Sequence, residues 1–308
     1  MKKNGIIIFI FLIPFFSPTT HIVKLRVKND GPVRILNKAL VPGYIINNAV
    51  EQPTKGKGLF VTIINKNKEI ELIWNNDFTN CSLMFAYSTN ITEIDLSGFN
   101  SDNITDMRLM FYNCTSLKSI NVAGLNTERV KYMIAMFANC SSLTSLDLSG
   151  FDTNNTIKLN FIFYGCHSLI SLNLTNFNLS SNENFNSMFF DCYRLKNLYL
   201  PSMSTTTKYI DFAYMFYNCY SLKSLNLSKW NISNVHIISF NSMFYNCTSL
   251  TSLNISNFDT SSVHHLGIFD SMFEGCKNLR YLNIFKLQDI IIPFYYRNIL
   301  KKTPENMV

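Results

Sequence analysis

Charged residues and long apolar runs are both scarce in this 308-residue chain. Charged side chains make up 15% of the residues and hydrophobic ones 47%, and this balance excludes an intrinsically disordered protein. No apolar run reaches the roughly 18 residues that a membrane-spanning helix needs, which excludes a polytopic membrane protein. The length alone favours two domains, but an internal repeat overrides that estimate.

Sequence signals of catalysis and of cofactor or metal binding are also missing. The chain has no G-x-S-x-G nucleophile motif, no Walker loop and no glycine-rich dinucleotide fingerprint. Its five histidines show no ligand spacing with a carboxylate or a cysteine. We therefore expect no catalytic residue, no cofactor and no metal site, and the chain is not predicted to be an enzyme.

The formal charge of +7 is unevenly distributed along the chain. Residues 21–80 hold nine Lys and Arg against five Asp and Glu, whereas residues 81–276 hold ten against thirteen. Nucleic-acid binding requires a basic stripe that neutralises phosphates, and this distribution predicts none along the central surface. Nucleic acid is therefore not an expected partner.

Pairs of adjacent apolar residues recur through the central part of the chain. Successive pairs are 26 residues apart over the first four intervals and then 27, 28 and 29 residues apart. After each pair, at a fixed offset, comes a cysteine (Ser88 in the first unit) and then an L-x-x-L-x-L stretch such as Leu143 to Leu148. This pattern predicts a leucine-rich-repeat solenoid of about eight 26–29-residue units. The pairs, seven of them Met-Phe and one Ile-Phe, begin at Met84, Met110, Met136, Ile162, Met188, Met215, Met243 and Met272.

Each unit combines two periodicities. In the second unit, apolar residues from Met107 to Leu117 recur at i, i+3, i+4, i+7 and i+10, the spacing of one face of a short helix. The period then changes: Leu117, Ile120 and Val122 are expected to face inward, and Ser119 and Asn121 outward, as in a short strand. A single unit cannot bury both faces, so the units must stack. The predicted fold class is α/β, with a parallel strand face, short helices opposite and the Met-Phe column as the core.

The full repeat has the form M-F-x-x-C-x-x-L-x-x-L-x-L-S-x-F-D-T, as at Met136 to Thr153 and, with one Ile for Leu, at Met243 to Thr260. It resembles the repeat of the BspA-like leucine-rich-repeat surface proteins of bacteria and protists over about residues 81–287. The stretch from Glu71 to Trp74 also resembles the β-rich N-terminal segment of the protist members. The resemblance implies a secreted or surface-displayed protein with roles in adhesion or host interaction. It assigns no binding residues.

Seven of the eight cysteines occupy one position of the repeat. Stacked units would align them in a column that points into the core, and parallel side-chain directions and an odd number argue against systematic pairing. Buried free thiols are the main expectation, because Cys behaves as a small buried hydrophobe, and a few disulfide bridges are the alternative. Cys81 lies off the column, and its state stays open.

The two ends of the chain differ from the repeats. Residues 1–19 have a basic start, an apolar run of eleven residues and small residues after it, which predicts a signal peptide. Within residues 20–80, apolar residues alternate with others in several short stretches, and Pro, Gly and Asn separate these stretches. This pattern predicts a β-rich N-terminal cap over the first unit. The repeat array is assigned to residues 81–287. Residues 288–308 form a C-terminal tail, and its apolar run is too short and interrupted for a membrane span or a lipid anchor.

Twelve N-x-S/T sequons occur in the chain. Asn113 and Asn139 precede a core cysteine, where turn formation accounts for the asparagine without any glycan. Asn103, Asn154 and Asn231 fall in predicted loops and are better candidates for glycosylation in a eukaryotic secretory route.

The outward positions of the predicted strand face are small and polar in most units. One column is Asn or Asp in all units but one, and an Asn/Asp hydrogen-bond ladder would explain it without a ligand. Tyr199 and Tyr281 interrupt the polar columns, and exposed aromatic residues are enriched at recognition hot spots. The connections of the last three units, including residues 231–239 and 261–267, also lengthen beyond what packing demands, and such loops often bind. The predicted partner-binding residues are Tyr199, Tyr281, Asn226, Asn254, Asn283, His264 and His265.

These features predict a secreted or surface-displayed recognition or adhesion protein that binds a protein or glycan on another cell or surface. The main alternative is a self-associating structural coat or matrix protein. An intracellular scaffold would require that the N-terminal apolar run is not a signal peptide. Localisation of a tagged chain separates the intracellular case, and the mass of the purified protein separates the self-associating one.

Overall fold

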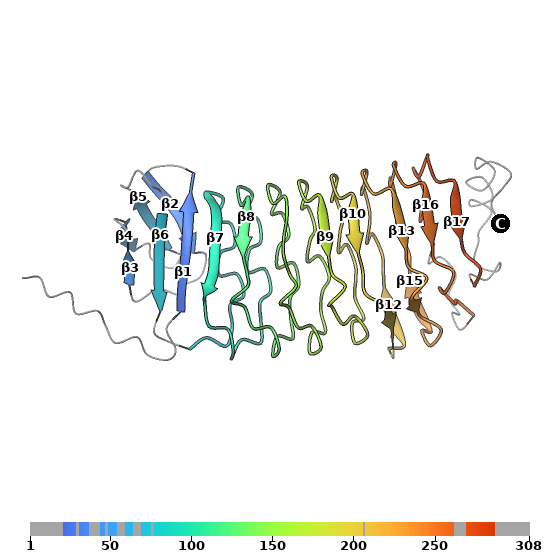
Figure 1. The fold of residues 1–308 in the computed structure, drawn as a ribbon, viewed down its shortest axis with the longest axis horizontal. Coiled ribbons are helices and arrows are strands. Elements are labelled where there is room, and N and C mark those ends of the chain that lie inside the picture. Colours follow the sequence, from blue (N-terminus) through green and yellow to red (C-terminus); the bar gives the residue numbers. More distant parts are fainter. Residues whose placement is uncertain are drawn as a thin grey trace, which may run out of the picture.

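The computed structural model describes residues 21–28, 31–36, 44–46, 49–53, 59–63, 69–74, 77–205, 207–261 and 269–286. The chain winds into an elongated solenoid whose successive turns stack along one axis (Figure 1). The array makes about seven turns. A β-rich region covers its N-terminal end.

The N-terminal region joins the array through one continuous sheet. Strand β1 (His21–Val27) pairs antiparallel with β6 (Glu69–Trp74) on one side and with β7 (Ile91–Gly98) on the other. Since β7 belongs to the first repeat unit, β1 occupies the place that a preceding unit would take. The sheet has the order β3-β6-β1-β7-β8, with β3 at Tyr44–Ile46 and β8 at Ser119–Asn121. A second sheet of order β2-β5-β4 contains Gly31–Leu36, Leu59–Ile63 and Ala49–Pro53.

The strand face of the array is parallel and in register, as the alternation predicted. In the last three units Ser224 lies opposite Ser252 and Ser252 opposite Tyr281. The short strands of this face are β8, β9 (Ser171–Asn173), β10 (Asn197–Tyr199), β13 (Ser224–Asn226), β16 (Ser252–Asn254) and β17 (Tyr281–Asn283). Four further short strands pair away from this face: β11 (Met203–Ser204) with β14 (Trp230–Asn231), and β12 (Tyr209–Asp211) with β15 (Ile237–Ser239).

The face opposite the strands contains no helix in the described part of the chain, so the predicted short helices are wrong. This turn face runs instead as consecutive β-turns. The Tyr112 amide donates to the Leu109 carbonyl at 3.1 Å, whereas the Phe111 amide donates to the Met136 carbonyl of the next unit at 2.9 Å. An α-helix would keep both bonds within one segment. On the turn face, alternate amides bond to the next unit, so the main chain itself holds the units together.

Two residues per unit adopt a positive φ, which a helix cannot accommodate. In the second unit they are Leu109 at 58° and Asn113 at 59°. The position before the cysteine holds Asn, Asp or Gly in seven of the eight units, and these residue types enter the left-handed region most readily. At Gly165 a Cβ atom would also collide with Oδ1 of Asn139 in the preceding unit. A chain of turns therefore reproduces the apolar spacing of a helix with a different backbone.

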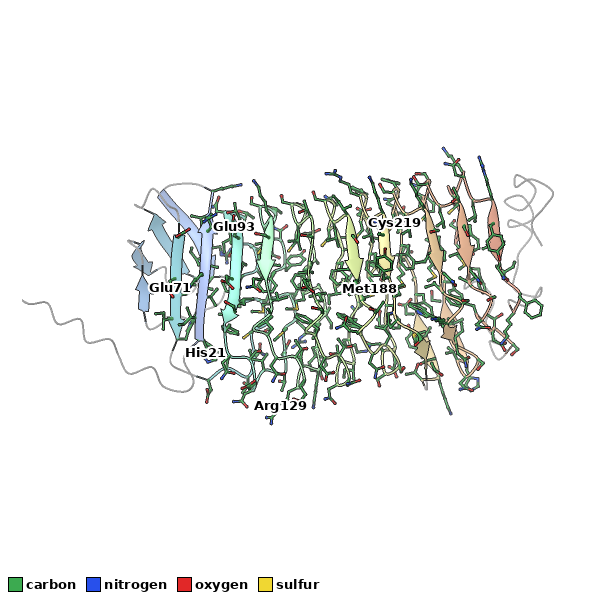
Figure 2. All side chains as sticks on the ribbon, in the orientation of Figure 1. His21, Glu71, Glu93, Arg129, Met188 and Cys219 are labelled. Atoms are coloured by element: carbon green, nitrogen blue, oxygen red, sulfur yellow. The ribbon has the colours of Figure 1, made fainter. Side chains whose placement is uncertain are left out.

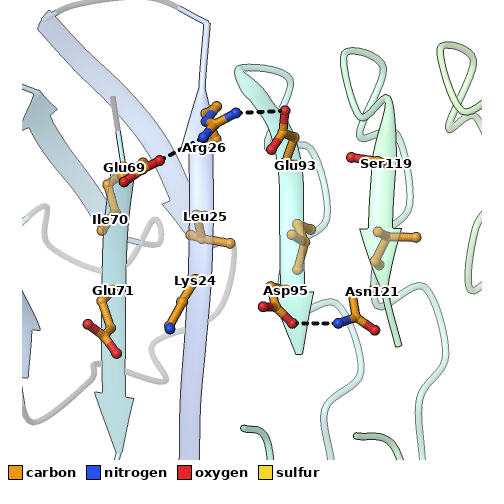
Figure 3. A pocket seen from close by; sticks show the side chains of 12 residues that line it. Lys24, Leu25, Arg26, Glu69, Ile70, Glu71, Glu93, Asp95, Ser119 and Asn121 are labelled. Atoms are coloured by element: carbon orange, nitrogen blue, oxygen red, sulfur yellow. Dashed lines mark hydrogen bonds and ion pairs between the residues drawn. The ribbon is translucent and has the colours of Figure 1, made fainter. Parts of the chain in front are cut away.

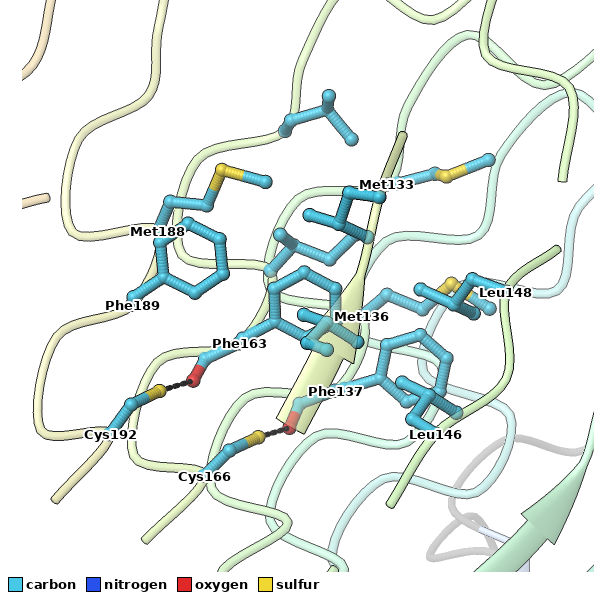
Figure 4. Close-up of a cluster of buried hydrophobic side chains, with 14 of the residues drawn as sticks. Met133, Met136, Phe137, Leu146, Leu148, Phe163, Cys166, Met188, Phe189 and Cys192 are labelled. Carbon is cyan, nitrogen blue, oxygen red and sulfur yellow. Dashed lines mark hydrogen bonds between the residues drawn. The ribbon is translucent and has the colours of Figure 1, made fainter. Parts of the chain in front are cut away.

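The Met-Phe pairs form the core, as predicted, and all their side chains are buried. The eight Phe rings stack in one continuous column, with neighbouring centroids 5.3–6.0 Å apart and ring planes within 14° of parallel. Figure 4 shows this column at Phe137, Phe163 and Phe189. Because each ring contacts the ring before and after it, every unit contributes to the packing of its neighbours.

The column cysteines are buried free thiols, which confirms that expectation, and Cys81 is a buried free thiol as well. Each column thiol donates a hydrogen bond to the Phe carbonyl of the preceding unit, as Cys166 does to Phe137 at 3.2 Å (Figure 4). The bond recurs in all seven units at 3.0–3.2 Å. In the first unit the Ser88 hydroxyl donates instead to the Ile35 carbonyl of β2 at 2.8 Å. The repeat position thus holds a small donor even where the cap replaces a preceding unit.

Candidate functional site

The two tyrosines predicted to bind a partner lie on the strand face and are exposed. Tyr199, at the end of β10, is 56% exposed, and Tyr281, at the start of β17, is 47% exposed. They belong to different columns, because Tyr281 lies opposite Ser252 whereas Tyr199 occupies the column of Asn254. Three strand spacings of about 4.8 Å put their units about 14 Å apart along the solenoid. The strands β13 and β16 lie between them.

The three predicted asparagines have a local structural role. Oδ1 of Asn226, Asn254 and Asn283 accepts a hydrogen bond from the backbone amide two residues later, at 3.0, 3.1 and 3.3 Å. Such Asx-turns end the strands. The asparagine ladder does not form: among the described residues of this column, a side-chain bond joins Asp95 and Asn121 alone, at 3.0 Å (Figure 3). The three carboxamide oxygens are therefore occupied by backbone amides, and Nδ2 of Asn283 donates to the Tyr281 hydroxyl at 3.5 Å.

The strand face changes character along the solenoid. Its outward positions include Glu93, Asp95 and Asp147 in the first three units. From the fourth unit on, these outward positions hold Ser, Asn and Tyr alone and carry no charge: Ser171, Asn173, Asn197, Tyr199, Ser224, Asn226, Ser252, Asn254, Tyr281 and Asn283.

The lengthened connections differ from free loops where they are described. Residues 231–239 contain the end of β14 and all of β15, and Ile232 and Val235 are fully buried. The expectation that packing does not demand these residues is therefore wrong. Of residues 261–267 the structure describes Ser261 alone, so His264 and His265 lie outside the described residues.

A hollow of about 510 Å³ lies where the cap meets the array, across β6, β1, β7 and β8 (Figure 3). Arg26 bridges the strands, with ion pairs to Glu69 at 2.6 Å and Glu93 at 3.1 Å. The hydrogen bond with Glu69 and the charge of Glu93 raise the pKa of Arg26. These groups are half-exposed, so the ion pairs add little stability, and the register between cap and array is that of the backbone pairing between β1 and β7. This hollow could not be predicted from the sequence, because β1 and β6 lie far from β8 in the chain.

Two rows of stacked aromatic rings on the turn side were not anticipated from the sequence. In one row, neighbouring centroids are 4.6–4.8 Å apart, and in the other they are 4.6 and 5.2 Å apart. The available signal was the aromatic residue that recurs two positions before or one position after the cysteine. The rows consist of Tyr164, Phe190, Tyr217 and Tyr245, and of His167, Tyr193 and Tyr220.

In the described ranges, no three His, Cys, Asp or Glu side chains come together in a way that could hold a metal ion. No element of those ranges is a helix with the length and hydropathy that crossing a membrane requires.

Residues 79–204 and 202–290 match a family described as "Mycoplasma protein of unknown function, DUF285". The chain belongs to this family. The matched residues of the DUF285 protein cover the stacked units, including both tyrosines of the strand face. A search of curated proteins found no match.

A solved structure similar to the DUF285 protein is a leucine-rich repeat protein from Bacteroides ovatus. The two share 17% sequence identity over 78% of this chain and 82% of that chain, with a TM-score of 0.24. Likeness at this level says nothing about function. The leucine-rich-repeat solenoid of the DUF285 protein is established by its own stacked units, with their buried leucines and parallel strands.

Proposed function

We propose that this DUF285 protein is a secreted or surface-displayed recognition protein that mediates adhesion by binding a protein or glycan on another cell or surface. The observation that carries the proposal is the pair of exposed tyrosines, Tyr199 and Tyr281, on an uncharged strand face. Large aromatic side chains in such positions supply most of the binding energy of many interfaces.

The surrounding surface supports this role because it is held in place. The strands that carry the tyrosines pair in register with their neighbours, and the asparagines end these strands through their own side chains. A partner that binds such a preorganised surface loses less conformational entropy than one that must order a loop. Stacked repeats commonly present extended binding surfaces of this kind.

Display outside the cell is supported by the sequence. Residues 1–19 have the pattern of a signal peptide, and the M-F-x-x-C repeat resembles that of BspA-like surface proteins, which act in adhesion. On this proposal the cysteines stay reduced in spite of an oxidising environment because all of them are buried.

The proposal is tested by localisation and competition in the source cells. A tagged full-length chain should be found in the medium or on intact cells, where added protease removes the tag. The purified chain should then compete with those cells for attachment to their natural target surface. Retention of the tag inside the cell, or attachment that is unaffected by excess purified chain, contradicts the proposal. Mass measurement of the same sample identifies self-assembly, the competing function.

A further inference from the structure

Six of the thirteen Lys and Arg residues between residues 81 and 286 occupy the same short stretch of the repeat. This stretch, the four positions after the cysteine, connects the turn face to the strand face. No Asp or Glu occurs in it in any of the eight units, counting from Ser88 in the first. We call this line of the solenoid the basic edge. Its cations are Lys118, Arg194, Lys196, Lys223, Lys277 and Arg280.

Backbone hydrogen bonds between units align the fourth position of this stretch, which holds Lys196, Lys223 and Arg280 in the fifth, sixth and eighth units. The Arg280 amide donates to the Thr251 carbonyl at 3.0 Å, and the Thr251 amide donates to the Lys223 carbonyl at 2.8 Å. Lys223 and Arg280 are thus two strand spacings, about 10 Å, apart on one line. The basic edge lies where the strands of the array begin, at the top of Figure 1 and Figure 2. Five of its six cations lie in the last four units.

The cations of the basic edge are available to a ligand. All six are exposed. Among the described residues, none of their side chains forms an ion pair or hydrogen bond, in contrast to Arg26 and Arg108, which are held by carboxylates. The overall composition of residues 81–276 does not reveal the basic edge, because the acidic residues that outnumber the cations lie outside this stretch of the repeat. The expectation that the array lacks a basic stripe is therefore wrong for its C-terminal units.

An aromatic row runs along the same edge. His167, Tyr193 and Tyr220 occupy the first of the four positions in successive units and stack within 13° of parallel. Burial and a hydrogen bond with Asp191 raise the pKa of Tyr193 to about 12, and burial also raises the pKa of Tyr220. The phenols are thus uncharged at neutral pH. Asp191, the acidic residue next to this row, is also held by Nδ2 of Asn218 at 2.8 Å.

We propose that the basic edge of the last four units binds a linear acidic polysaccharide through its sulfate or carboxylate groups. The cations of the fifth, sixth and eighth units lie along about 15 Å of one edge, which matches one extended polyanion. The aromatic faces cover one another, so stacking of nucleic-acid bases, which needs free ring faces, is disfavoured. This inference rests on the proposed recognition function and names a class of partner, but it uses residues other than the strand-face tyrosines.

Binding of the full chain to immobilised heparin, polygalacturonate and neutral dextran tests the inference. A triple variant, Arg194→Ser, Lys223→Thr and Arg280→Thr, introduces residues that other units carry at these positions, so its thermal unfolding should match the parent. A matched control, Arg129→Ser, Lys131→Thr and Lys208→Thr, removes the same charge outside the basic edge. We expect the parent to bind heparin or polygalacturonate but not dextran, with affinity falling as salt rises.

The edge variant should lose about tenfold or more in affinity, whereas the control should stay within about twofold. A stronger response to heparin assigns sulfate groups, and one to polygalacturonate assigns carboxylates. Equal losses in the two variants, or tighter binding to single-stranded DNA or anionic vesicles, overturn the inference. The Tyr199→Asn, Tyr281→Ser variant should keep polysaccharide binding. If cell attachment persists without any polysaccharide binding, this inference fails and the proposed adhesion function stands.

Discussion

A cysteine suits its position in each unit because it is small, apolar and able to donate one weak hydrogen bond. The thiol fills the space behind the Phe column and satisfies a carbonyl of the preceding unit, as Cys114 does with Phe85 at 3.1 Å. A serine can make the same bond, and Ser88 does so toward the cap. Ser88 is as completely buried as the thiols, so what the thiol adds is the apolar character of a small hydrophobe. Burial raises the pKa of Cys114 and Cys166 to about 12.

These raised pKa values predict that stability falls in alkaline solution. In the unfolded chain a thiol ionises near pH 9, whereas the folded protein holds Cys166 protonated until about pH 12. The stabilisation is complete below pH 9 and is lost as pH rises through this window, by about 1.4 kcal/mol per pH unit for each such thiol. Cys166→Ser keeps a donor without this ionisation. Its free energy of unfolding, measured by urea titration, should fall less steeply with pH than that of the parent, and an identical slope would disprove the assignment.

The left-handed residues give a second prediction at this scale, and it discriminates between a turn and a helix. Asn113 has a φ of 59°. In a helix, Asn113→Ala would stabilise the protein by about 0.5 kcal/mol, because alanine has the higher helix propensity. In the observed turn the same change should destabilise the protein by about 1 kcal/mol. Alanine keeps the steric strain of a Cβ atom at positive φ but lacks the short polar side chain whose local hydrogen bonds offset that strain in asparagine. Asn113→Gly serves as the control and should be better tolerated than alanine. Denaturant midpoints of the three proteins decide the sign.

At the scale of elements, the sequence predicted the strand half of each unit and misjudged the turn half. The inward and outward pattern from Leu117 to Val122 has one structural meaning, a strand, and a parallel strand forms where it is predicted. The spacing of Met107, Met110 and Phe111 fits two structures, because a chain of β-turns buries the same positions as a helix. Hydrogen bonds between adjacent units select the turns, and the pattern of a single unit does not contain that information. The Asn before the cysteine was the local sign of a positive φ.

The stacked Phe column predicts a large cost for removing one ring. Phe137 is fully buried and contacts Phe111 and Phe163 at centroid distances of 5.4 and 6.0 Å. Phe137→Ala should lower the free energy of unfolding by about 3–5 kcal/mol through loss of packing and formation of a cavity. Ile157→Ala, at a site 39% exposed, is the control and should stay within about 0.5 kcal/mol of the parent. Equal thermal stability of the two variants would mean that the stacked Phe rings do not stabilise the core.

At the scale of the whole molecule, the solenoid arranges its surfaces in lines. The uncharged strand face, the basic edge and the aromatic rows each run along the axis, because each uses one position of the repeat. The two tyrosines could be found from the sequence, since they interrupt regular columns. The role of Asn226 and Asn254 in ending strands could not, and the basic edge emerged only when residues 26 to 29 positions apart were brought side by side.

The most direct test of the proposed function is adhesion by a chain without its two strand-face tyrosines. Tyr199→Asn and Tyr281→Ser give each column the residue that neighbouring units carry, so the double variant should fold with the parent's thermal stability. Tyr209→Thr removes another exposed tyrosine away from this face and is the control. Adhesion of the purified proteins to the natural target surface should fall about tenfold or more for the double variant and remain unchanged for the control. Full adhesion by the folded double variant would contradict the account.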